Sequence, residues 1–305
     1  MLRPPSGEQF EISLGEQHAT IVEVGGGIRS YSQGDRDVLE PYPVDQICDG
    51  AHGAVLVPWP NRIGDGSYKF EGRHHQLELS EPDKRTAIHG LLRWVPWRAL
   101  EHEPERVLVG ARLHPRPGYP FDLVLGVEYA LAAEGLTVTI TARNVGASAA
   151  PYGAGQHPYL SPGAGTIDAC TLELPARTLV LTDPERALPC GREDLDGGPF
   201  DFREARPVGS SEIDAPFADL NRDPRGRATA RLTGADGATV ELWVDEGYRL
   251  LEVFTGDTLA HARRRTGLAV EPMTCPPDAF RSGEELIRLG PGESSVASWG
   301  VRLDG

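Results

Sequence analysis

Residues 121–145 read FDLVLGVEYALAAEGLTVTITARNV, and this stretch decides the fold. Apolar and polar side chains alternate along residues 121–131 and again along residues 135–145, as in β-strands with one buried face. Valine, threonine, isoleucine and tyrosine, which favour strands, recur in both runs. Glu134-Gly135 stands at the junction and is typical of a hairpin turn. The stretch therefore predicts two antiparallel strands joined by a tight turn.

The same alternation recurs elsewhere in the chain. It is found in residues 74–80 (HHQLELS), 106–114 (RVLVGARLH) and 237–246 (GATVELWVDE). Asp236-Gly237 separates the last of these runs from TARLTG, residues 229–234, and predicts a second hairpin. The 36 glycines and 26 prolines leave few windows that could sustain three helical turns. We therefore predict an all-β fold, a large antiparallel β-sandwich with long loops and little helix.

The chain has 305 residues, enough for one large β-rich domain or two ordinary domains. Proline, glycine and aspartate are concentrated in residues 182–209, which are either a linker or a long loop beside a site. No repeat of fixed period divides the rest of the sequence. We predict a single domain over residues 1–305.

The net charge of −15 argues against a nucleic-acid partner and against an anionic membrane surface. No apolar stretch approaches the length of a membrane span, and the first residues lack the apolar core of a signal peptide. The cysteines have neither C-x-x-C nor zinc-ligand spacing, so we expect reduced thiols at Cys48, Cys170, Cys190 and Cys275. These features predict a cytoplasmic protein, monomeric or homodimeric, that acts on a small molecule.

Five segments place ionisable side chains beside proline or glycine. They contain Arg62 after Trp59-Pro60-Asn61, His89 before Gly90, His157 before Pro158, Asp214 in EIDAPF, and Glu271 before Pro272. Because proline restricts the residue before it, the backbones of His157 and Glu271 are expected to be extended. Glu271 also follows Leu268-Ala269-Val270, which predicts an apolar strand that ends on a carboxylate. Burying a charge at a strand end is unfavourable in free energy unless the charge has a function or a partner. A lone histidine or arginine in a loop, by contrast, is more often structural than catalytic.

Several other chemistries lack their usual motifs. Neither H-E-x-x-H nor H-x-H occurs, and there is no G-x-S-x-G elbow for a serine nucleophile. Gly25-Gly26-Gly27 has no lysine after it and opens no helix, so it does not resemble a phosphate loop. We therefore expect no metal and no cofactor.

Six motifs together carry a resemblance to a known family. They are NRIGDGSYKFEGRHHQLEL (61–79), IHG (88–90), GQHPYL (155–160), EIDAPF (212–217), VFTGD (253–257) and GLAVEPMTCPPDAF (267–280). In this order and spacing the chain resembles the aldose 1-epimerase (galactose mutarotase) family, from about Gly25 to Leu303. The resemblance implies a large β-sandwich that interconverts the α- and β-anomers of free aldoses, a small-molecule monosaccharide substrate, and no cofactor.

The resemblance also implies roles for particular residues. Glu271 is expected to be the general base and His157 the general acid. The side chains expected to hold sugar hydroxyls are those of Arg62, His89 and Asp214, with Glu252 at a position where relatives often carry glutamine. Free glutamate and histidine titrate near about 4.3 and 6.5, so we expect an ionised base and an acid whose pKa is shifted modestly upward.

The chain departs from the family pattern at two positions besides Glu252. Leu91 follows His89-Gly90 where many relatives have a second glycine, and Ala215 follows Asp214 where many have histidine or asparagine. Both departures concern sugar preference, not the acid–base pair.

Two other functions stay open. The run His261-Ala262-Arg263-Arg264-Arg265 suggests a phosphate grip and hence a hexose-6-phosphate mutarotase, although such a run is also typical of a solvated face. The same sandwich could also serve a non-catalytic sugar-binding or sugar-sensing protein. Aromatic rings near the motifs either line a sugar cleft or fill the core; they belong to Trp59, Tyr159 and Phe217.

Overall fold

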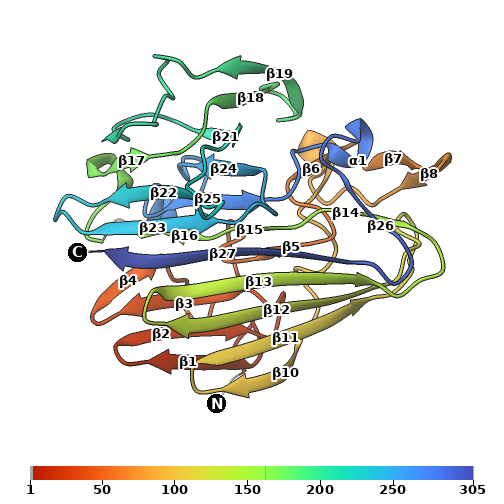
Figure 1. Ribbon diagram of the computed structural model, residues 1–305, viewed down its shortest axis with the longest axis horizontal. Coiled ribbons are helices and arrows are strands. Elements are labelled where there is room, and N and C mark those ends of the chain that lie inside the picture. The colour runs from red at the N-terminus through yellow and green to blue at the C-terminus, as the bar shows by residue number, and fades with distance from the viewer. Residues whose placement is uncertain (1–2, 162, 305) are drawn as a thin grey trace.

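The computed structural model describes residues 3–161 and 163–304, and two large antiparallel sheets dominate it (Figure 1). The larger sheet has 12 strands. Ten of them follow one another in the order β1 (Gln9–Leu14), β2 (Gln17–Val22), β3 (Ile28–Gln33), β4 (Arg36–Leu39), β16 (Tyr159–Leu160), β25 (Leu268–Met273), β24 (Leu250–Phe254), β21 (Asp214–Ala218), β18 (Thr178–Thr182) and β19 (Pro189–Asp194). The other two are β15 (Gly155–Gln156), which pairs with β25, and β5 (Val55–Leu56), which pairs with β15.

The second sheet has nine strands, and most of them cross the front of the view in Figure 1. Their order is β10 (Arg98–Glu103), β11 (Arg106–Leu113), β12 (Leu123–Ala132), β13 (Gly135–Asn144), β27 (Ser294–Asp304), β23 (Thr239–Val244), β22 (Ala228–Thr233), β17 (Thr171–Glu173) and β20 (Arg206–Pro207).

Three two-stranded sheets and four short helices complete the described elements. The small sheets pair β14 (Ala150–Tyr152) with β26 (Ile287–Leu289), β6 (Arg62–Gly64) with β9 (Thr86–Ile88), and β7 (Ser67–Phe70) with β8 (Arg73–Gln76). The helices are α1 (Ala279–Ser282) and the 3₁₀ turns η1 (Pro82–Lys84), η2 (Ile167–Ala169) and η3 (His261–Arg263). The predicted all-β fold with large antiparallel sheets and little helix is confirmed.

The predicted hairpin in residues 121–145 is present as β12 and β13. Their register runs from Leu123↔Asn144 to Ala132↔Gly135, so the turn is Ala133-Glu134 and Gly135 already begins the second strand. The buried positions alternate along β12, as the apolar pattern requires. The second hairpin also forms, between β22 and β23.

One buried cluster draws side chains from both large sheets, among them Trp97, Tyr129, Val270 and Trp299. A buried polar link crosses the same interface. The Gln156 amide donates to the Tyr129 hydroxyl at 2.9 Å, and the Trp299 indole N–H donates to Gln156 Oε1 at 3.0 Å. The nine-stranded sheet therefore fixes the residue that precedes His157. We infer that the two sheets form one structural domain.

The expectation that the apolar strand ends at Glu271 is wrong. Strand β25 continues through Pro272 to Met273 and is buried throughout. Proline is tolerated here because the Val270 and Thr274 amides on either side donate to Pro158 O and Ala154 O, toward the interrupted edge formed by β15 and β16. Glu271 is therefore a mid-strand residue of the larger sheet.

Two other expected segments differ in extent. Of residues 74–80, only the first part is a strand, since β8 ends at Gln76. Residues 182–209 are neither a linker nor a plain loop, because they contain β19 and β20, which are the edge strands of the two large sheets.

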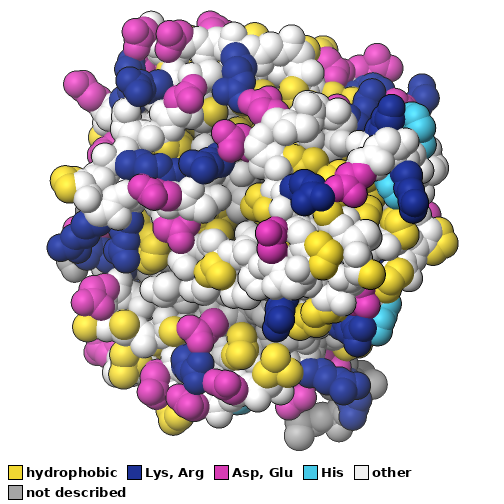
Figure 2. Space-filling model, turned by 45° about the vertical axis from the view of Figure 1, so that its right-hand side comes forward, with side chains coloured by type: hydrophobic (Ala, Val, Ile, Leu, Met, Phe, Trp, Pro, Cys, Tyr) yellow, Lys and Arg dark blue, Asp and Glu magenta, His cyan; other side chains and the backbone are white. Residues whose placement is uncertain are grey.

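Acidic and basic side chains are interspersed on the face shown in Figure 2. Within residues 3–161 and 163–304, no helix is long and apolar enough to cross a membrane. All four cysteines lie in the described part of the chain and are free thiols.

Candidate active site

The register of the larger sheet places His157, Glu271 and Glu252 in one row. Glu252 in β24 is directly opposite Glu271 in β25. On the other side of β25, the pairs Gly155↔Met273 and Tyr159↔Ala269 flank the position where His157 faces Glu271. Residues opposite one another in antiparallel strands project from the same face. The three side chains therefore meet on one face of the sheet.

Asp214 joins this face from the next strand. Pro216 in β21 is opposite Glu252, and Asp214 lies two residues away, on the same face of the strand. Arg62 and His89 come from the small β6–β9 sheet, in which Arg62 pairs with Ile88. The His89 amide donates to Asn61 O at 2.9 Å, and both residues have left-handed backbones, with φ of 60° and 52°. This local geometry turns the β6–β9 segment toward the larger sheet.

Five of the six predicted site residues line one cavity of about 400 Å³, a volume typical of small-molecule sites. Its walls are formed by Gly50, Ala51, Asn61, Arg62, Glu81, Lys84, Ile88, His89, Arg93, His157, Asp214, Phe254, Thr258, Leu259 and Glu271. The sixth residue, Glu252, is buried beside Glu271 and accepts a hydrogen bond from the Asn61 amide at 3.2 Å.

His157 and Glu271 are in direct contact. Nε2 of His157 lies 3.1 Å from Oε1 of Glu271, and the two residues are 5% and 2% exposed. Among the described residues, no hydrogen-bond partner reaches His157 Nδ1, His89 Nδ1 or Glu271 Oε2. Buried polar atoms without partners are uncommon in native proteins. These three atoms are therefore free to bind the hydroxyl groups of a ligand.

Burial shifts both members of this pair toward their neutral forms. It raises the pKa of Glu271 well above the usual carboxyl value, with Glu252 and Asp214 adding to the rise and Arg62 and Arg93 opposing it. Burial also lowers the pKa of His157 well below that of free histidine. The expected upward shift of the histidine pKa is therefore wrong. Since the two groups touch, the protonation of each affects the pKa of the other.

Burial also favours the neutral form of Glu252. Burial, together with the charge of Asp214, raises the pKa of Glu252 well above the usual 4.5, against the opposing charges of Arg62 and Lys84. A protonated carboxyl has one donor and remaining acceptor capacity, much like the side-chain amide of glutamine. Glu252 therefore presents nearly the same chemistry as the glutamine expected at this position in relatives.

Glu252→Gln is expected to flatten the pH dependence of stability. A carboxyl group whose pKa is raised by folding stabilises the protein fully below its unfolded value, and this contribution is lost as the pH rises through the folded value. Above the unfolded carboxyl value of about 4.3, the free energy of unfolding of the variant should therefore fall less steeply with rising pH than that of the wild type. Urea unfolding across this range tests it, with the exposed Glu212→Gln as control. Identical slopes for wild type and Glu252→Gln would contradict the assignment.

Arg62 is largely engaged within the protein. Its Nε and Nη2 donate to the two oxygens of Glu81 at 2.8 and 3.1 Å, a bidentate pair. The Thr86 hydroxyl donates to the same carboxylate at 2.7 Å. The charge of Arg62 is therefore matched by Glu81, and Nη1 is the guanidinium nitrogen left for a ligand.

With this geometry in place, comparison with known proteins decides the family. The sequence profile of aldose 1-epimerases matches residues 8–301. The chain belongs to the aldose 1-epimerase family. It is 36% identical to the Escherichia coli protein YihR over an alignment of 296 residues. This alignment covers 94% of this chain and 91% of YihR.

Solved structures of aldose 1-epimerase relatives have the same fold. A putative aldose 1-epimerase from Escherichia coli superposes with a TM-score of 0.84 at 22% identity, covering 97% of this chain and 99% of that one. The aldose epimerase homologue from Caenorhabditis elegans superposes with a TM-score of 0.86 at 17% identity. The superposition covers 97% of this chain and 98% of that one. The resemblance inferred from the six motifs is confirmed.

In this family member, the aromatic rings near the motifs mostly fill the core. Trp59 and Phe217 are 2% and 0% exposed. The Tyr159 ring is stacked between two histidines, with centroids 3.7 Å from His52 and 5.0 Å from His157. Its hydroxyl donates to Gly50 O at 2.7 Å. Tyr159 therefore supports the ring of His157 from behind and does not line the cavity.

Ten of the fifteen residues that line the cavity were not predicted as site residues, and three of these bear on the argument. Phe254 could have been found, because it is two residues from Glu252 in the same strand and so shares its face. Glu81 gave no signal, since its pairing with Arg62 depends on the fold of the β6–β9 segment. Arg93 lies close after His89 in the sequence, but no motif marks it.

Two of the three arginines in the run before β25 are engaged in ion pairs. Arg263 Nε lies 3.5 Å from Glu40 Oε1. Arg265 Nη1 lies 2.9 Å from Asp257 Oδ1, and its Nε pairs with Asp168. Arg264 is exposed, as on a solvated face, and none of the three lines the cavity of His157 and Glu271.

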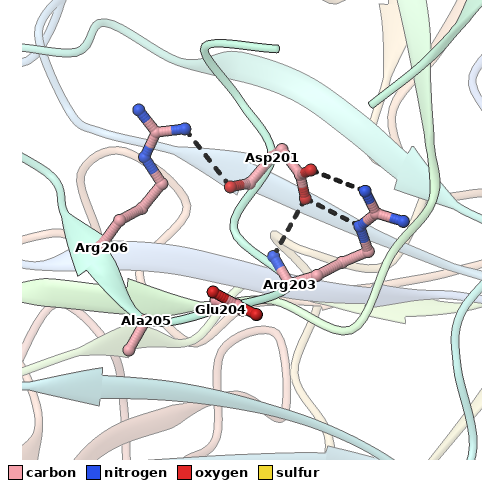
Figure 3. A pocket seen from close by; sticks show the side chains of 5 residues that line it. All are labelled: Asp201, Arg203, Glu204, Ala205 and Arg206. Carbon is pink, nitrogen blue, oxygen red and sulfur yellow. Dashed lines mark hydrogen bonds and ion pairs between the residues drawn. The ribbon is translucent and has the colours of Figure 1, made fainter. Parts of the chain in front are cut away.

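A second hollow, of about 570 Å³, lies beside residues 201–206 (Figure 3). Its polar groups bind one another. Arg203 donates to both oxygens of Asp201 at 2.8 and 2.6 Å, and Arg206 donates to Gly198 O at 3.1 Å. Although it is larger, this hollow lacks a contacting acid–base pair, so we place the candidate active site in the cavity of His157 and Glu271.

Proposed function

We propose that this protein is an aldose 1-epimerase that interconverts the α- and β-anomers of free aldoses through the pair Glu271 and His157. The observation that carries the proposal is the 3.1 Å contact between His157 Nε2 and Glu271 Oε1 in a buried row that opens on a sugar-sized cavity. A carboxylate and an imidazole at this separation suit the removal of one proton and the delivery of another.

The reaction needs one proton transfer at each of two oxygens. Glu271 takes the proton of the C1 hydroxyl while His157 gives a proton to the ring oxygen. The bond between C1 and the ring oxygen breaks, and C1 becomes the carbon of an aldehyde. Rotation about the C1–C2 bond turns the other face of the aldehyde toward the C5 hydroxyl. Ring closure then reverses both transfers and restores the pair.

The directions of the pKa shifts fit this cycle. With the closed ring bound, the reactive form is ionised Glu271 beside protonated His157. After ring opening, the pair is neutral, and this is the form that burial favours. The nearby charges of Arg62 and Arg93 favour ionised Glu271 but disfavour protonated His157, so their effects on the ionised pair oppose one another. Ring opening therefore leaves the pair in the neutral form that burial favours.

The remaining residues are assigned to holding the sugar. His89 Nδ1 and the Nη1 of Arg62 supply hydrogen-bonding groups at one wall, and Asp214 supplies an exposed carboxylate at the rim. Phe254 offers a ring against which an apolar sugar face packs. Glu252, protonated, fixes Asn61 and lies beside Glu271.

The proposal is tested by polarimetry. Freshly dissolved α-anomers of galactose, glucose, xylose, arabinose and fucose should reach anomeric equilibrium faster in proportion to the amount of protein added. Optical rotation that relaxes at the buffer rate for every aldose tested, neutral and charged, would refute the proposed function.

A further inference from the structure

The cavity contains two cationic side chains that neither give nor take a proton in the proposed reaction. Arg93 and Lys84 both line it. Among the described residues, neither side-chain cation has a carboxylate oxygen within the 4.0 Å of an ion pair. Arg62, by contrast, lies in the same wall with a bidentate carboxylate partner. Arg62 is therefore neutralised by its partner, whereas Arg93 and Lys84 have no ion-pair partner among the described residues.

The Arg93 side chain lines the cavity of His157 and Glu271 and also a neighbouring hollow that Trp94 lines. Its charge lowers the pKa of His89, His157 and Glu271, as a cation near these groups does. Arg93 is itself partly buried, and its Cζ lies 5.2 Å from the centre of the Trp94 ring. A guanidinium taken out of water without a partner is unfavourable.

Glu271 is an incomplete counter-ion for Arg93. Burial, Glu252 and Asp214 favour protonated Glu271, and in that form it carries no charge. Each turnover also moves the carboxyl group between its two forms. A permanent cation in the cavity wall, with no ion-pair partner among the described residues, is suited to binding an anion that arrives with the substrate.

We propose that the cavity selects an aldose carrying an anionic substituent, and that Arg93 binds this substituent. The inference rests on the proposed function. The reaction requires a free hydroxyl at C1, so the anion must be attached elsewhere on the sugar, and C6 is the most remote carbon of a hexose. A planar guanidinium binds phosphate, carboxylate or sulfonate oxygens with paired N–H donors. The ammonium group of Lys84 adds positive charge but lacks the paired N–H donors of a guanidinium, so we assign it the weaker contribution to binding.

The test compares neutral sugars with charged ones. Substrates are glucose and galactose, their 6-phosphates, their 6-carboxylates and their C6 sulfonates, each added as a fresh anomer. The wild type should have a higher kcat/KM for at least one anionic group than for the neutral parent, and the three groups show which anion is preferred. This preference should weaken as ionic strength rises.

Arg93→Met should lower kcat/KM for the preferred anionic sugar by about 10- to 100-fold, since it removes a charge-assisted hydrogen-bonding pair. The rate on the neutral parent should change less than this, because the Arg93 charge acts on Glu271 and His157 in opposite senses. Arg93→Lys should recover part of the loss. Arg225→Met, at an exposed turn, is the control for the change in net charge. Lys84→Met should have a smaller effect than Arg93→Met.

Three results would overturn the inference. One is a wild type that turns over the neutral parents at least as well as every charged sugar. Another is an equal loss on neutral and charged sugars in Arg93→Met, because Arg93 would then act through Glu271. The third is a selective loss in Lys84→Met that Arg93→Met does not show.

A wild type that turns over no sugar would refute the proposed function instead. Calorimetric binding of the same charged sugars to the wild type and to Arg93→Met would then decide the inference separately. Binding that Arg93→Met weakens would support it, and equal or absent binding would overturn it.

Discussion

Glu271→Gln is expected to lower the rate of enzymatic anomer exchange by about 10²–10⁴-fold, the usual contribution of a positioned general acid or base. The amide keeps the shape of the side chain but can no longer take the C1 proton. Because the other walls of the cavity are unchanged, the affinity for sugar should be largely retained. Polarimetry gives the rate, and calorimetry gives the binding.

The matched control is Glu134→Gln, which makes the same change in the exposed turn between β12 and β13. It should keep the wild-type rate. If Glu271→Gln folds normally and also keeps the wild-type rate, the assignment of the base is wrong. If every variant and the wild type bind sugar without accelerating anomer exchange, the protein is a binding or sensing protein on this fold.

His157→Asn is expected to lower the rate by a similar factor, about 10²–10⁴-fold, because the ring oxygen loses its proton donor. The two groups act as a unit, so their effects should not multiply. The double variant Glu271→Gln/His157→Asn should be at most about 10-fold slower than the slower single variant. Polarimetry on the four proteins completes this cycle.

The control for the histidine change is His18→Asn, at an exposed position of β2. Losses that multiply fully in the double variant would indicate that the two residues act independently, against the contact at 3.1 Å. A wild-type rate in His157→Asn would remove His157 from the mechanism.

Periodicity predicted the strands of this protein well, but their pairing less well. The hairpin of β12 and β13 is local, and its two alternating runs are adjacent in the sequence. The pairings of β15 and β16 with β25 join distant segments, and together they bring His157 opposite Glu271. The prolines that follow His157 and Glu271 marked both residues in the sequence. The strand register that places them opposite one another is seen only in the folded sheet.

The main failure of sequence reasoning was the direction in which the pKa of His157 is shifted. Solution pKa values suggested an ionised base and a slightly strengthened acid. The actual environment is the interior of the larger sheet, where Glu252 and Asp214 share one face with Glu271. Desolvation by neighbours from distant strands cannot be read from residues 267–280 alone. The partner of Arg62 was missed for the same reason.

The most direct test of the central claim is ¹H saturation transfer in D₂O with a sugar that the enzyme accepts. Saturating the α-anomer H1 signal should reduce the β-anomer H1 signal at a rate proportional to enzyme. In spectra recorded without saturation, the summed integrals of H1 and of H2 should stay constant over time. That result requires ring opening and closure by proton transfer at oxygen alone. No transfer above the buffer rate, or a progressive loss of the H2 signal, would contradict an anomer exchange carried out by Glu271 and His157.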